Sequence, residues 1–215
     1  MQRTLQPELL DSLAPTDPDA LHNRRDLRIT NRVMGNHRWF ERTLPRLLKS
    51  GERVLELGAG TGELGHRLIR AQIRVDGLDL WPRPDDWPAE REWHRADLLS
   101  FPGYAQYGVV IGNLIFHQFS DEDLSALGKS LRGHARVILA CEPARRRVSQ
   151  TLFGIFGRAL GANHVSLHDA RVSIAAGFCG NELPRTLGLD PLEWECRIHA
   201  TTLGAYRMIA IRRSP

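Results

Sequence analysis

Residues Val54–Gly65 constrain this chain more than any other segment. The sequence VLELGAGTGELG begins as a short apolar run typical of a buried strand and ends as the start of a helix. Gly58, Gly60 and Gly62 stand between the two, and Gly65 follows within the helix. Glycine lets the backbone turn sharply and approach a ligand closely, with N–H groups aimed at it. The segment therefore predicts a ligand-binding loop between a strand and a helix.

Two kinds of cofactor use a loop of this type. Gly60, Gly62 and Gly65 have the G-x-G-x-x-G spacing of dinucleotide sites, in which the loop contacts a pyrophosphate. Glu56, inside the strand, indicates the other kind, because a carboxylate repels a pyrophosphate and attracts a cation. A cationic cofactor is therefore favoured. An NAD(P)-dependent oxidoreductase that uses the Gly60–Gly65 loop stays open as the alternative.

Strands alternate with helices along most of the chain. This order predicts an α/β fold with a doubly wound, mostly parallel sheet that helices cover on both faces. The last two strand-like runs are joined by a turn at Gly204 with no helix between them, so they predict an antiparallel hairpin. Strands are expected within 53–58, 73–80, 92–99, 107–116, 136–143, 191–203 and 205–213, and helices within 63–72, 120–131 and 148–161.

Polar residues close several of the predicted strands. Asp79 ends the second strand, 19 residues after Gly60, where a carboxylate can accept both hydroxyls of a ribose. Asp97 ends the third strand and could accept from an adenine amino group, with Leu98 packed on the ring. Asn113 ends the fourth strand beneath the same crevice. For each of these residues a plain turn-forming role stays open.

Together these features make residues 53–213 resemble the class I S-adenosylmethionine (SAM)-dependent methyltransferases of the small-molecule type. The shared features are the strand order, the E-x-G-x-G-x-G loop, the acids after the second and third strands, and the terminal hairpin. The resemblance implies a seven-stranded sheet whose last strand is antiparallel, SAM as the cofactor, and O- or C-methylation of a small molecule. It also implies a cofactor site made by Glu56, Gly58, Gly60, Gly62, Asp79, Leu80, Asp97, Leu98 and Asn113.

The acceptor side of the site is less marked in the sequence. Methyl transfer to a hydroxyl, an acidic carbon or an amine benefits from a general base, and histidine suits proton transfer near neutral pH. His117 follows Asn113 by four residues, and His168 and Asp169 lie in the long segment after the fifth strand. These three are the candidate catalytic residues. Because the chain has nine histidines, packing and surface roles stay open for them.

Three consecutive arginines, Arg145–Arg147, follow the fifth strand at the carboxyl edge of the sheet. They could clamp an anionic or carrier-bound acceptor, and a solvated start of a helix is the ordinary alternative. The overall charge does not indicate nucleic acid, because 29 basic and 25 acidic residues leave only +4. Asn113 is followed by Leu-Ile-Phe rather than the Pro-Pro-aromatic sequence of base methyltransferases. An RNA or protein methyltransferase stays an alternative.

The chain is expected to form one methyltransferase domain over residues 1–215, with its segments divided by task. A break at Gly35-Asn36 should separate two helices near the N-terminus. Residues 162–178 are expected to be irregular, with a helix resuming at Asn181. The divisions are an N-terminal arm and helical cover (1–50), a cofactor-binding half (51–143), a lid that selects the substrate (144–187) and the C-terminal hairpin (188–215).

Cysteine usage and hydropathy indicate the compartment. Cys141, Cys179 and Cys196 are too far apart for a C-x-x-C metal or redox motif, so they predict reduced thiols and no metal site. The N-terminal segment lacks the apolar stretch of a signal peptide, and no run approaches the roughly 20 apolar residues of a membrane span. We therefore expect a cytoplasmic protein without a membrane partner, and the sequence carries no signal for its oligomeric state.

Overall fold

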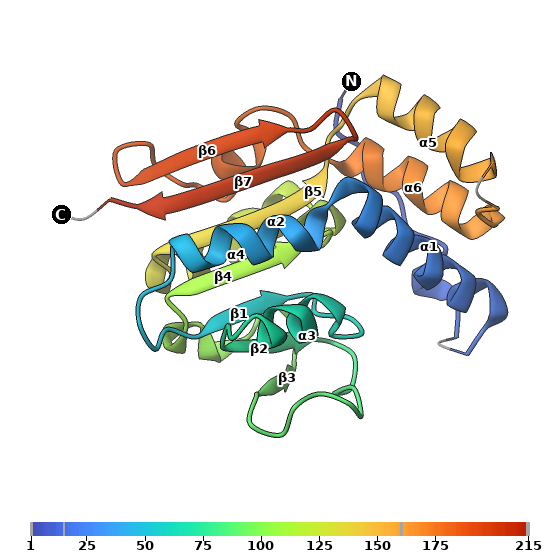
Figure 1. Cartoon of the computed structure of the whole chain (residues 1–215). Coiled ribbons are helices and arrows are strands. Elements are labelled where there is room, and N and C mark those ends of the chain that lie inside the picture. Colours follow the sequence, from blue (N-terminus) through green and yellow to red (C-terminus); the bar gives the residue numbers. More distant parts are fainter. Residues whose placement is uncertain (1, 15, 160, 214–215) are drawn as a thin grey trace.

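The computed structural model describes residues 2–14, 16–159 and 161–213 (Figure 1). Within these residues a seven-stranded sheet has the order β3-β2-β1-β4-β5-β7-β6. Its strands are β1 (Val54–Leu57), β2 (Val75–Asp79), β3 (Trp93–Arg95), β4 (Val109–Asn113), β5 (Val137–Pro143), β6 (Trp194–Ala200) and β7 (Ala205–Arg212).

The directions of the strands confirm the predicted fold class. β1 to β5 pair in parallel, whereas β7 runs antiparallel to both β5 and β6. The hairpin between β6 and β7 turns at Gly204, whose φ of +89° favours glycine. Glu56 of β1 pairs with Gly77 of β2 and with Ile111 of β4. The carboxyl ends of these three strands therefore meet at one edge of the sheet.

Helices cover both faces of the sheet, as expected for a doubly wound fold. Phe40 of α2 (Asn36–Thr43) and Leu68 of α3 (Glu63–Arg70) belong to the core on one face together with Val54. Leu127 of α4 (Asp121–His134) belongs to the core on the other face together with Leu55. Successive residues of β1 thus serve opposite faces. The 3-10 helix η2 (Leu44–Arg46) joins the first core, and η3 (Pro102–Gln106) and α7 (Glu182–Thr186) join the second.

Three further helices form a layer beyond the carboxyl ends of β4 and β5. They are α1 (Pro18–Met34), α5 (Arg147–Ala159) and α6 (His164–Ala176), and α6 contacts both of the others (Figure 1). The side chain of Asp17 accepts from the N–H of Asp19 and caps α1. Gly35 ends α1 with a φ of +66°, so α1 and α2 meet at an elbow, which confirms the predicted break.

The expectation that residues 162–178 are irregular is wrong. The helix α6 occupies most of this segment, and the side chain of Asn163 caps it by accepting from the N–H of Ser166. The segment lacks a clear helical stripe because α6 is buried on several sides, including at polar Ser166 and Asp169. The helix predicted within 148–161 is confirmed as α5 up to Ala159, while Leu160 lies outside the described residues.

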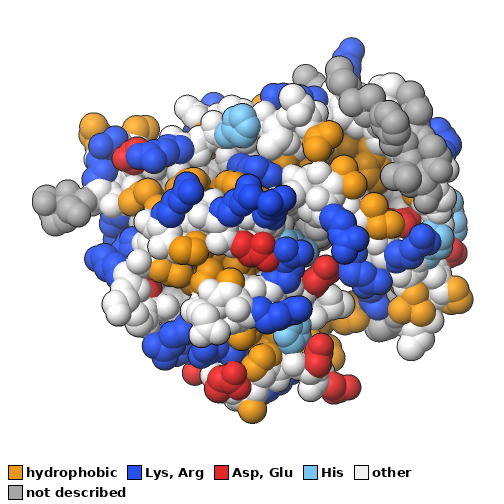
Figure 2. Space-filling model, in the orientation of Figure 1, with side chains coloured by type: hydrophobic (Ala, Val, Ile, Leu, Met, Phe, Trp, Pro, Cys, Tyr) orange, Lys and Arg blue, Asp and Glu red, His pale blue; other side chains and the backbone are white. Residues whose placement is uncertain are grey.

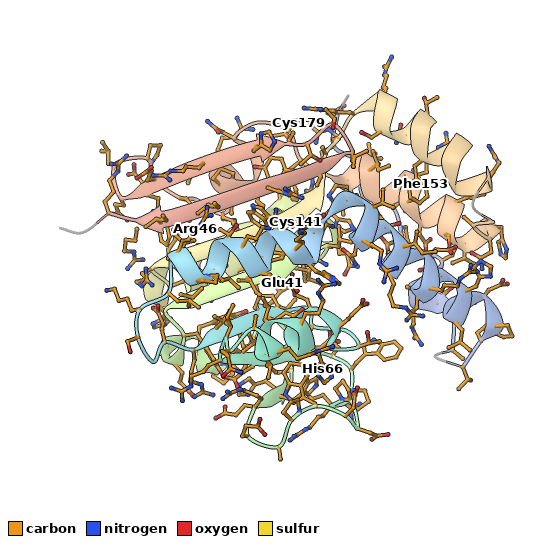
Figure 3. All side chains as sticks on the ribbon, viewed as in Figure 1. Glu41, Arg46, His66, Cys141, Phe153 and Cys179 are labelled. Atoms are coloured by element: carbon orange, nitrogen blue, oxygen red, sulfur yellow. The ribbon has the colours of Figure 1, made fainter. Side chains whose placement is uncertain are left out.

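Arginine side chains gather on the surface over α1 and α2 (Figure 2). On the same helix α2, the side chain of Glu41 (labelled in Figure 3) accepts from Nε of Arg67 at 2.6 Å. This contact joins α2 to α3. The exposed arginines of the two helices are Arg25, Arg28, Arg32, Arg38 and Arg42.

No helix in the described part of the chain is both long and apolar enough to cross a membrane.

Candidate functional site

The glycine loop after β1 has the backbone conformation that its sequence predicts. Gly58, Gly60 and Gly62 have φ values of +62°, +55° and +73°, which other residues rarely adopt. A Cβ at Gly58 would lie 2.6 Å from the side chain of Ile115, so this glycine also allows close packing. A Cβ at Gly60 would meet no atom within 4 Å. The loop is therefore tightly packed at Gly58 and open at Gly60.

The N–H groups of these glycines are used within the protein. Gly58 donates to the carbonyl oxygen of Leu78 at 2.9 Å, and Gly62 donates to that of Ala59 at 2.8 Å. Gly60 donates to Oδ2 of Asp79 at 2.7 Å. A pyrophosphate-binding loop needs such N–H groups for its ligand. The end of β2 and the backbone of the loop itself therefore hold the loop in place. These N–H groups are not free to bind a phosphate.

Glu56 lies in β1 immediately below the loop and is 3% exposed. Burial raises the pKa of Glu56 to about 8, the charge of Asp79 adds to this, and the backbone N–H of Gly65 opposes it. Its Oε2 atom is buried and has no hydrogen-bond partner among the described residues. A buried carboxylate oxygen without a partner is costly. Glu56 is thus suited to a ligand that brings a positive charge or hydrogen-bond donors.

A cluster of three asparagines lies at the end of the neighbouring strand. Oδ1 of Asn31 on α1 accepts from Nδ2 of Asn113 at 3.1 Å and from Nδ2 of Asn36 at 3.0 Å. The Oδ1 atoms of Asn36 and Asn113 are buried without a partner in the described part of the chain. Sequence reasoning found Asn113 but missed Asn31 and Asn36, because Gly35-Asn36 indicates only a break between helices. The elbow between α1 and α2 brings these residues to β4.

The residues predicted to hold a nucleoside lie farther along the same edge. Asp79 ends β2, and Leu80 beside it is 67% exposed. β3 ends at Arg95, so Asp97 is in the following loop, where its Oδ1 accepts from the N–H of Leu99 at 2.9 Å. The side chain of Leu98 is buried in the core. The structure thus brings Glu56, Gly58, Gly60, Gly62, Asp79 and Asn113 together at the ends of β1, β2 and β4, with Leu80, Asp97 and Leu98 toward the edge strand β3.

A second polar site lies after β4, at the short helix η4 (Phe116–Gln118). Nδ1 of His117 is 2.6 Å from Oε2 of Glu142, whose side chain is completely buried at the end of β5. Glu142 also accepts from the backbone N–H groups of Ile115, Phe116 and His117, at 2.9, 3.0 and 3.2 Å. This carboxylate fixes both the turn and the imidazole. Sequence reasoning singled out His117 but gave Glu142 no role.

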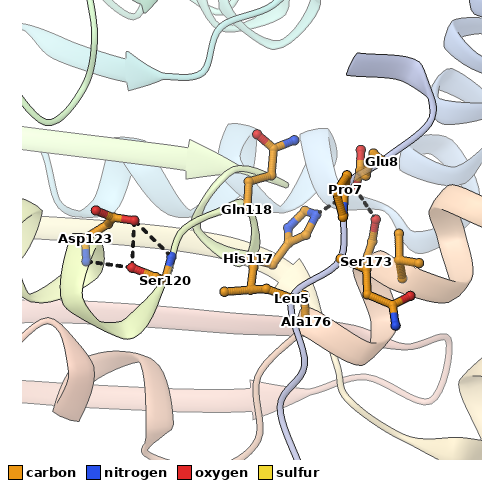
Figure 4. A pocket seen from close by; sticks show the side chains of 11 residues that line it. Leu5, Pro7, Glu8, His117, Gln118, Ser120, Asp123, Ser173 and Ala176 are labelled. Carbon is orange, nitrogen blue, oxygen red and sulfur yellow. Dashed lines mark hydrogen bonds and ion pairs between the residues drawn. The ribbon is translucent and has the colours of Figure 1, made fainter. Parts of the chain in front are cut away.

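The other side of His117 faces the N-terminal arm, which we define as residues 2–12 and which contains the 3-10 helix η1 (Leu10–Ser12). Nε2 of His117 is 3.4 Å from Oε1 of Glu8, and the hydroxyl of Ser173 on α6 donates to the same oxygen (Figure 4). Burial disfavours a charged imidazole, but Glu142 and Glu8 outweigh it and raise the pKa of His117 to about 9. A cavity of about 370 Å³ opens between the arm, η4 and α6.

The other two predicted catalytic residues lie on the same arm-facing side of α6. Asp169 accepts from the backbone N–H groups of Leu9 and Leu10, at 2.7 and 3.1 Å, and from Nδ2 of Asn23 at 3.1 Å. Nδ1 of His168 is 3.2 Å from Oδ1 of Asp169, and the side chain of His168 is 41% exposed. The structure therefore brings His117 and Asp169 to neighbouring residues of one arm, and Asp169 anchors that arm.

The arginine clamp expected after β5 is not formed by Arg145. This side chain is buried, where it donates to the carbonyl oxygen of Gly177 at 3.0 Å and pairs with Glu182 of α7. It therefore joins the end of β5 to the segment that follows α6. Arg146 and Arg147 are exposed. An anion-binding role at this place has no support from Arg145.

Sequence comparison relates part of the chain to bacterial methyltransferases. No protein-family profile matches the chain. Over 102 residues, or 43% of the chain, it is 32% identical to the uncharacterized methyltransferase YrrT of Bacillus subtilis, with 48% of that protein covered. The chain thus spans about half the length of the curated relatives it matches.

Solved structures match over almost the whole chain. The plantazolicin methyltransferase BpumL in complex with S-adenosylhomocysteine (SAH) has a TM-score of 0.70 at 13% identity, covering 93% of this chain and 92% of that one. The plantazolicin methyltransferase BamL, in complex with a triazolic desmethylPZN analog and SAH, has a TM-score of 0.72 at 9% identity, covering 95% and 93%. The chain therefore shares the fold of these methyltransferases, and the fold that the resemblance implied is confirmed.

Proposed function

We propose that this protein is a SAM-dependent methyltransferase that methylates an oxygen or a carbon of a small-molecule or peptide acceptor. The observation that carries this proposal is the buried Glu56 below a glycine loop whose own N–H groups are already engaged. SAM carries a cationic methionyl end, and structural neighbours of this chain were solved with SAH. The partial match to a bacterial methyltransferase supports the same activity.

The buried polar atoms of the site fit the methionyl end of SAM. Glu56 and Asn113 lie on adjacent strands and on the sheet face that α2 and α3 cover, because they alternate with residues of the opposite core. Each has an acceptor oxygen without a donor among the described residues, as has Asn36. An ammonium group supplies three N–H donors and one positive charge. We infer that these three residues hold that end of the cofactor.

The remaining predicted residues would hold the nucleoside. Both oxygens of Asp79 accept backbone N–H groups, from Gly60 and Trp81, and both keep a further lone pair for ribose hydroxyls. We propose that Leu80, Asp97 and Leu98 frame the adenine beyond Asp79. When bound, SAM would supply a methyl group on a sulfonium sulfur, which passes in line to a nucleophile while SAH leaves. The protein's part is to orient the acceptor and to exclude water.

A nicotinamide-dependent oxidoreductase fits this site less well. Its pyrophosphate would need the N–H groups of Gly58, Gly60 and Gly62, which bond to Leu78, Asp79 and Ala59 instead. Glu56 offers a pyrophosphate no positive charge, and its ionised form would repel it. The G-x-G-x-x-G spacing is therefore shared by chance with dinucleotide sites. The acceptor alternatives are RNA and proteins, and neither has a specific observation in its favour.

On the acceptor side, we propose that the cavity beside His117 receives the substrate. His117 lines this cavity and would act by direct contact, and Asp169 would act by holding the arm that covers the cavity. His168 lines a neighbouring cavity and would act through its contact with Asp169. Residues 1–50 and 144–187 would then form the cover that selects the acceptor. We also propose a cytoplasmic location, because Cys141, Cys179 (both labelled in Figure 3) and Cys196 are free thiols.

Binding of SAH and of NADH, measured by tryptophan fluorescence, tests the proposed cofactor. We expect SAH to bind with a dissociation constant near ~10 μM and NADH to leave the signal unchanged. Glu56→Ala should weaken SAH binding, whereas Glu90→Ala, an exposed control in the loop before β3, should not. Binding of NADH without binding of SAH would overturn the proposal.

A further inference from the structure

Two hydrogen-bond donors of the protein body converge on one carboxylate of the arm. Nε2 of His117 lies 3.4 Å from Oε1 of Glu8, and the Ser173 hydroxyl donates to the same oxygen (Figure 4). The side chains of His117 and Glu8 are only 5% and 15% exposed. A carboxylate with these two partners is bound as a charged ligand would be.

Both donors are held by contacts outside the arm. Glu142 at the end of β5 fixes the imidazole of His117 and the turn before it, through a side-chain contact and three backbone N–H groups. Ser173 is part of α6, which packs against α1 and α5. His117 and Ser173 therefore form a preformed pair of donors. Glu8 accepts from this pair and does not position it.

Glu8 itself is carried by a segment with little regular structure. The arm is attached at both sides of Glu8. On one side Arg3 donates to the carbonyl oxygens of Ala176 and Phe119, at 2.8 and 2.7 Å, and on the other Leu9 donates to Asp169. Its leucines are only partly buried, since Leu5 and Leu9 are 43% and 36% exposed. Arg3 also pairs with Asp121, so polar contacts rather than an apolar core attach the arm. Segments attached in this way are the ones that open locally.

The free side of His117 offers a charged hydrogen-bond donor at this position. The pKa of His117 is about 9, because the two carboxylates outweigh its burial, so the imidazole is a cation near neutral pH. Glu142 balances that charge, so the imidazolium presents to Glu8 a charged N–H donor rather than a net positive charge. Asp123 also lines the cavity, but its carboxylate accepts from the N–H and the hydroxyl of Ser120. A carboxylate in the place of Glu8 accepts from the charged N–H of the imidazole more strongly than a neutral hydroxyl does.

We propose that the acceptor carries a carboxylate that displaces Glu8 and binds to His117 and Ser173. The remainder of the acceptor would then lie in the cavity, whose lining includes the apolar side chains of Leu5, Pro7, Val172 and Ala176. The lining also includes the polar side chains of Gln6, Gln118 and Ser120. An acid with an apolar or aromatic body that carries further polar groups matches this combination. The inference rests on the proposed methyltransferase function and gives its substrate class. The carboxylate is the anchor, and the methylated atom is another part of the same molecule or the anchor itself.

Calorimetric titration of the full chain, saturated with SAH, with 2-naphthoate and with its neutral analogue 2-naphthamide tests this inference. We expect the acid to bind and the amide to bind at least tenfold more weakly. Glu8→Gln removes the internal competitor and should strengthen naphthoate binding by about tenfold, because a tethered group competes at millimolar effective concentration. Ser173→Ala should weaken it about fivefold. Glu122→Gln and Ser125→Ala, both exposed on α4, are the matched controls.

An NMR readout separates direct contact from a structural role. The imidazole ¹⁵N resonances of His117, assigned by their loss in His117→Asn, should shift on addition of naphthoate and stay unchanged with naphthamide. Equal binding of acid and amide, or no naphthoate binding to Glu8→Gln up to about 10 mM, would overturn the inference. The proposed function would still stand if SAH binds in the same samples. If the wild-type protein does not bind SAH, the proposed function itself is wrong.

Discussion

The backbone N–H of Gly60 donates to Oδ2 of Asp79 at 2.7 Å, so the last residue of β2 holds the middle of the glycine loop. The other oxygen of Asp79 accepts from the N–H of Trp81 at 2.8 Å. One carboxylate thus joins the loop after β1 to the loop after β2. The loop is in place before a cofactor arrives, which lowers the cost of ordering it on binding.

This relationship predicts a large effect of Asp79→Ala. The substitution removes the ribose acceptor and also frees the N–H of Gly60, so SAH binding should weaken about 100-fold, the loss of two charge-assisted hydrogen bonds. Asp79→Asn keeps one acceptor oxygen, so its affinity for SAH should lie between those of the wild type and Asp79→Ala. Isothermal titration with SAH is the measurement, and Asp85→Ala, exposed in the next loop, is the control. Unchanged affinity in Asp79→Ala would contradict the assignment of the ribose site.

Glu56 predicts a pH dependence of stability in the free protein. Its pKa is raised to about 8, so the folded state holds a proton that the unfolded state releases near pH 4.5. The stabilisation that this provides is complete below about pH 4.5 and is lost as the pH rises toward 8, at up to about 1.4 kcal/mol per pH unit. Glu56→Gln stays neutral and should lack this loss. Its free energy of unfolding should equal that of the wild type near pH 5 and exceed it at pH 8.

Urea unfolding of both proteins at these two pH values is the measurement. Glu90→Gln serves as an exposed carboxylate control and should follow the wild type. The prediction fails if the difference between Glu56→Gln and the wild type is the same at both pH values. Addition of SAH should reduce the difference at pH 8, since a cation next to Glu56 favours its ionised form.

The strands of this fold were predictable because their signals are local. β1 and β5 are mostly apolar runs, each interrupted by one glutamate, and the hairpin of β6 and β7 has no helix between its strands. The elbow at Gly35 and the cap of α4 at Ser120, which forms a capping box with Asp123, also lie in short stretches of sequence. Such features need only neighbouring residues, so sequence reasoning found them.

The parts that were missed depend on distant contacts. Asn31 and Asn113 are 82 residues apart, and Glu8 and His117 are 109 apart. No spacing in the sequence indicates that these pairs meet, because the elbow and the arm that bring them together are placed by tertiary packing. The helix α6 was missed for a related reason, since burial on several sides removes the polar face that marks a surface helix.

Glu142→Gln should destabilise the protein by about 3 kcal/mol at pH 7, because it removes the charge that balances buried His117. The pKa of His117 in the folded state is raised from 6.5 to about 9, so its contribution is complete below pH 6.5 and is lost as the pH rises through 9. The cost of Glu142→Gln should therefore shrink at pH 10. Urea unfolding at the two pH values measures it, with Glu122→Gln as control. Equal costs at pH 7 and pH 10 would contradict a cationic His117.

Substitution by alanine should have different main effects at two glycines of the loop: on stability at Gly58 and on SAH binding at Gly60. Gly58→Ala places a Cβ 2.6 Å from Ile115 and requires a φ of +62°, so strain and overpacking together should cost about 3 kcal/mol of stability. Gly60→Ala meets no atom within 4 Å and should cost only about 1 kcal/mol for its φ of +55°. Its methyl group enters the open space beside Asp79, so it should weaken SAH binding more than tenfold.

Thermal unfolding and SAH titration of Gly58→Ala and Gly60→Ala measure the two predicted effects. Gly133→Ala in α4, where a Cβ also meets no atom within 4 Å and φ is not positive, is the control and should change neither quantity for the worse. A Gly60→Ala protein that binds SAH as the wild type does would place the cofactor elsewhere. The open side of Gly60 would then be ordinary solvent-facing surface, and the case for Asp79 as a ribose ligand would fall with it.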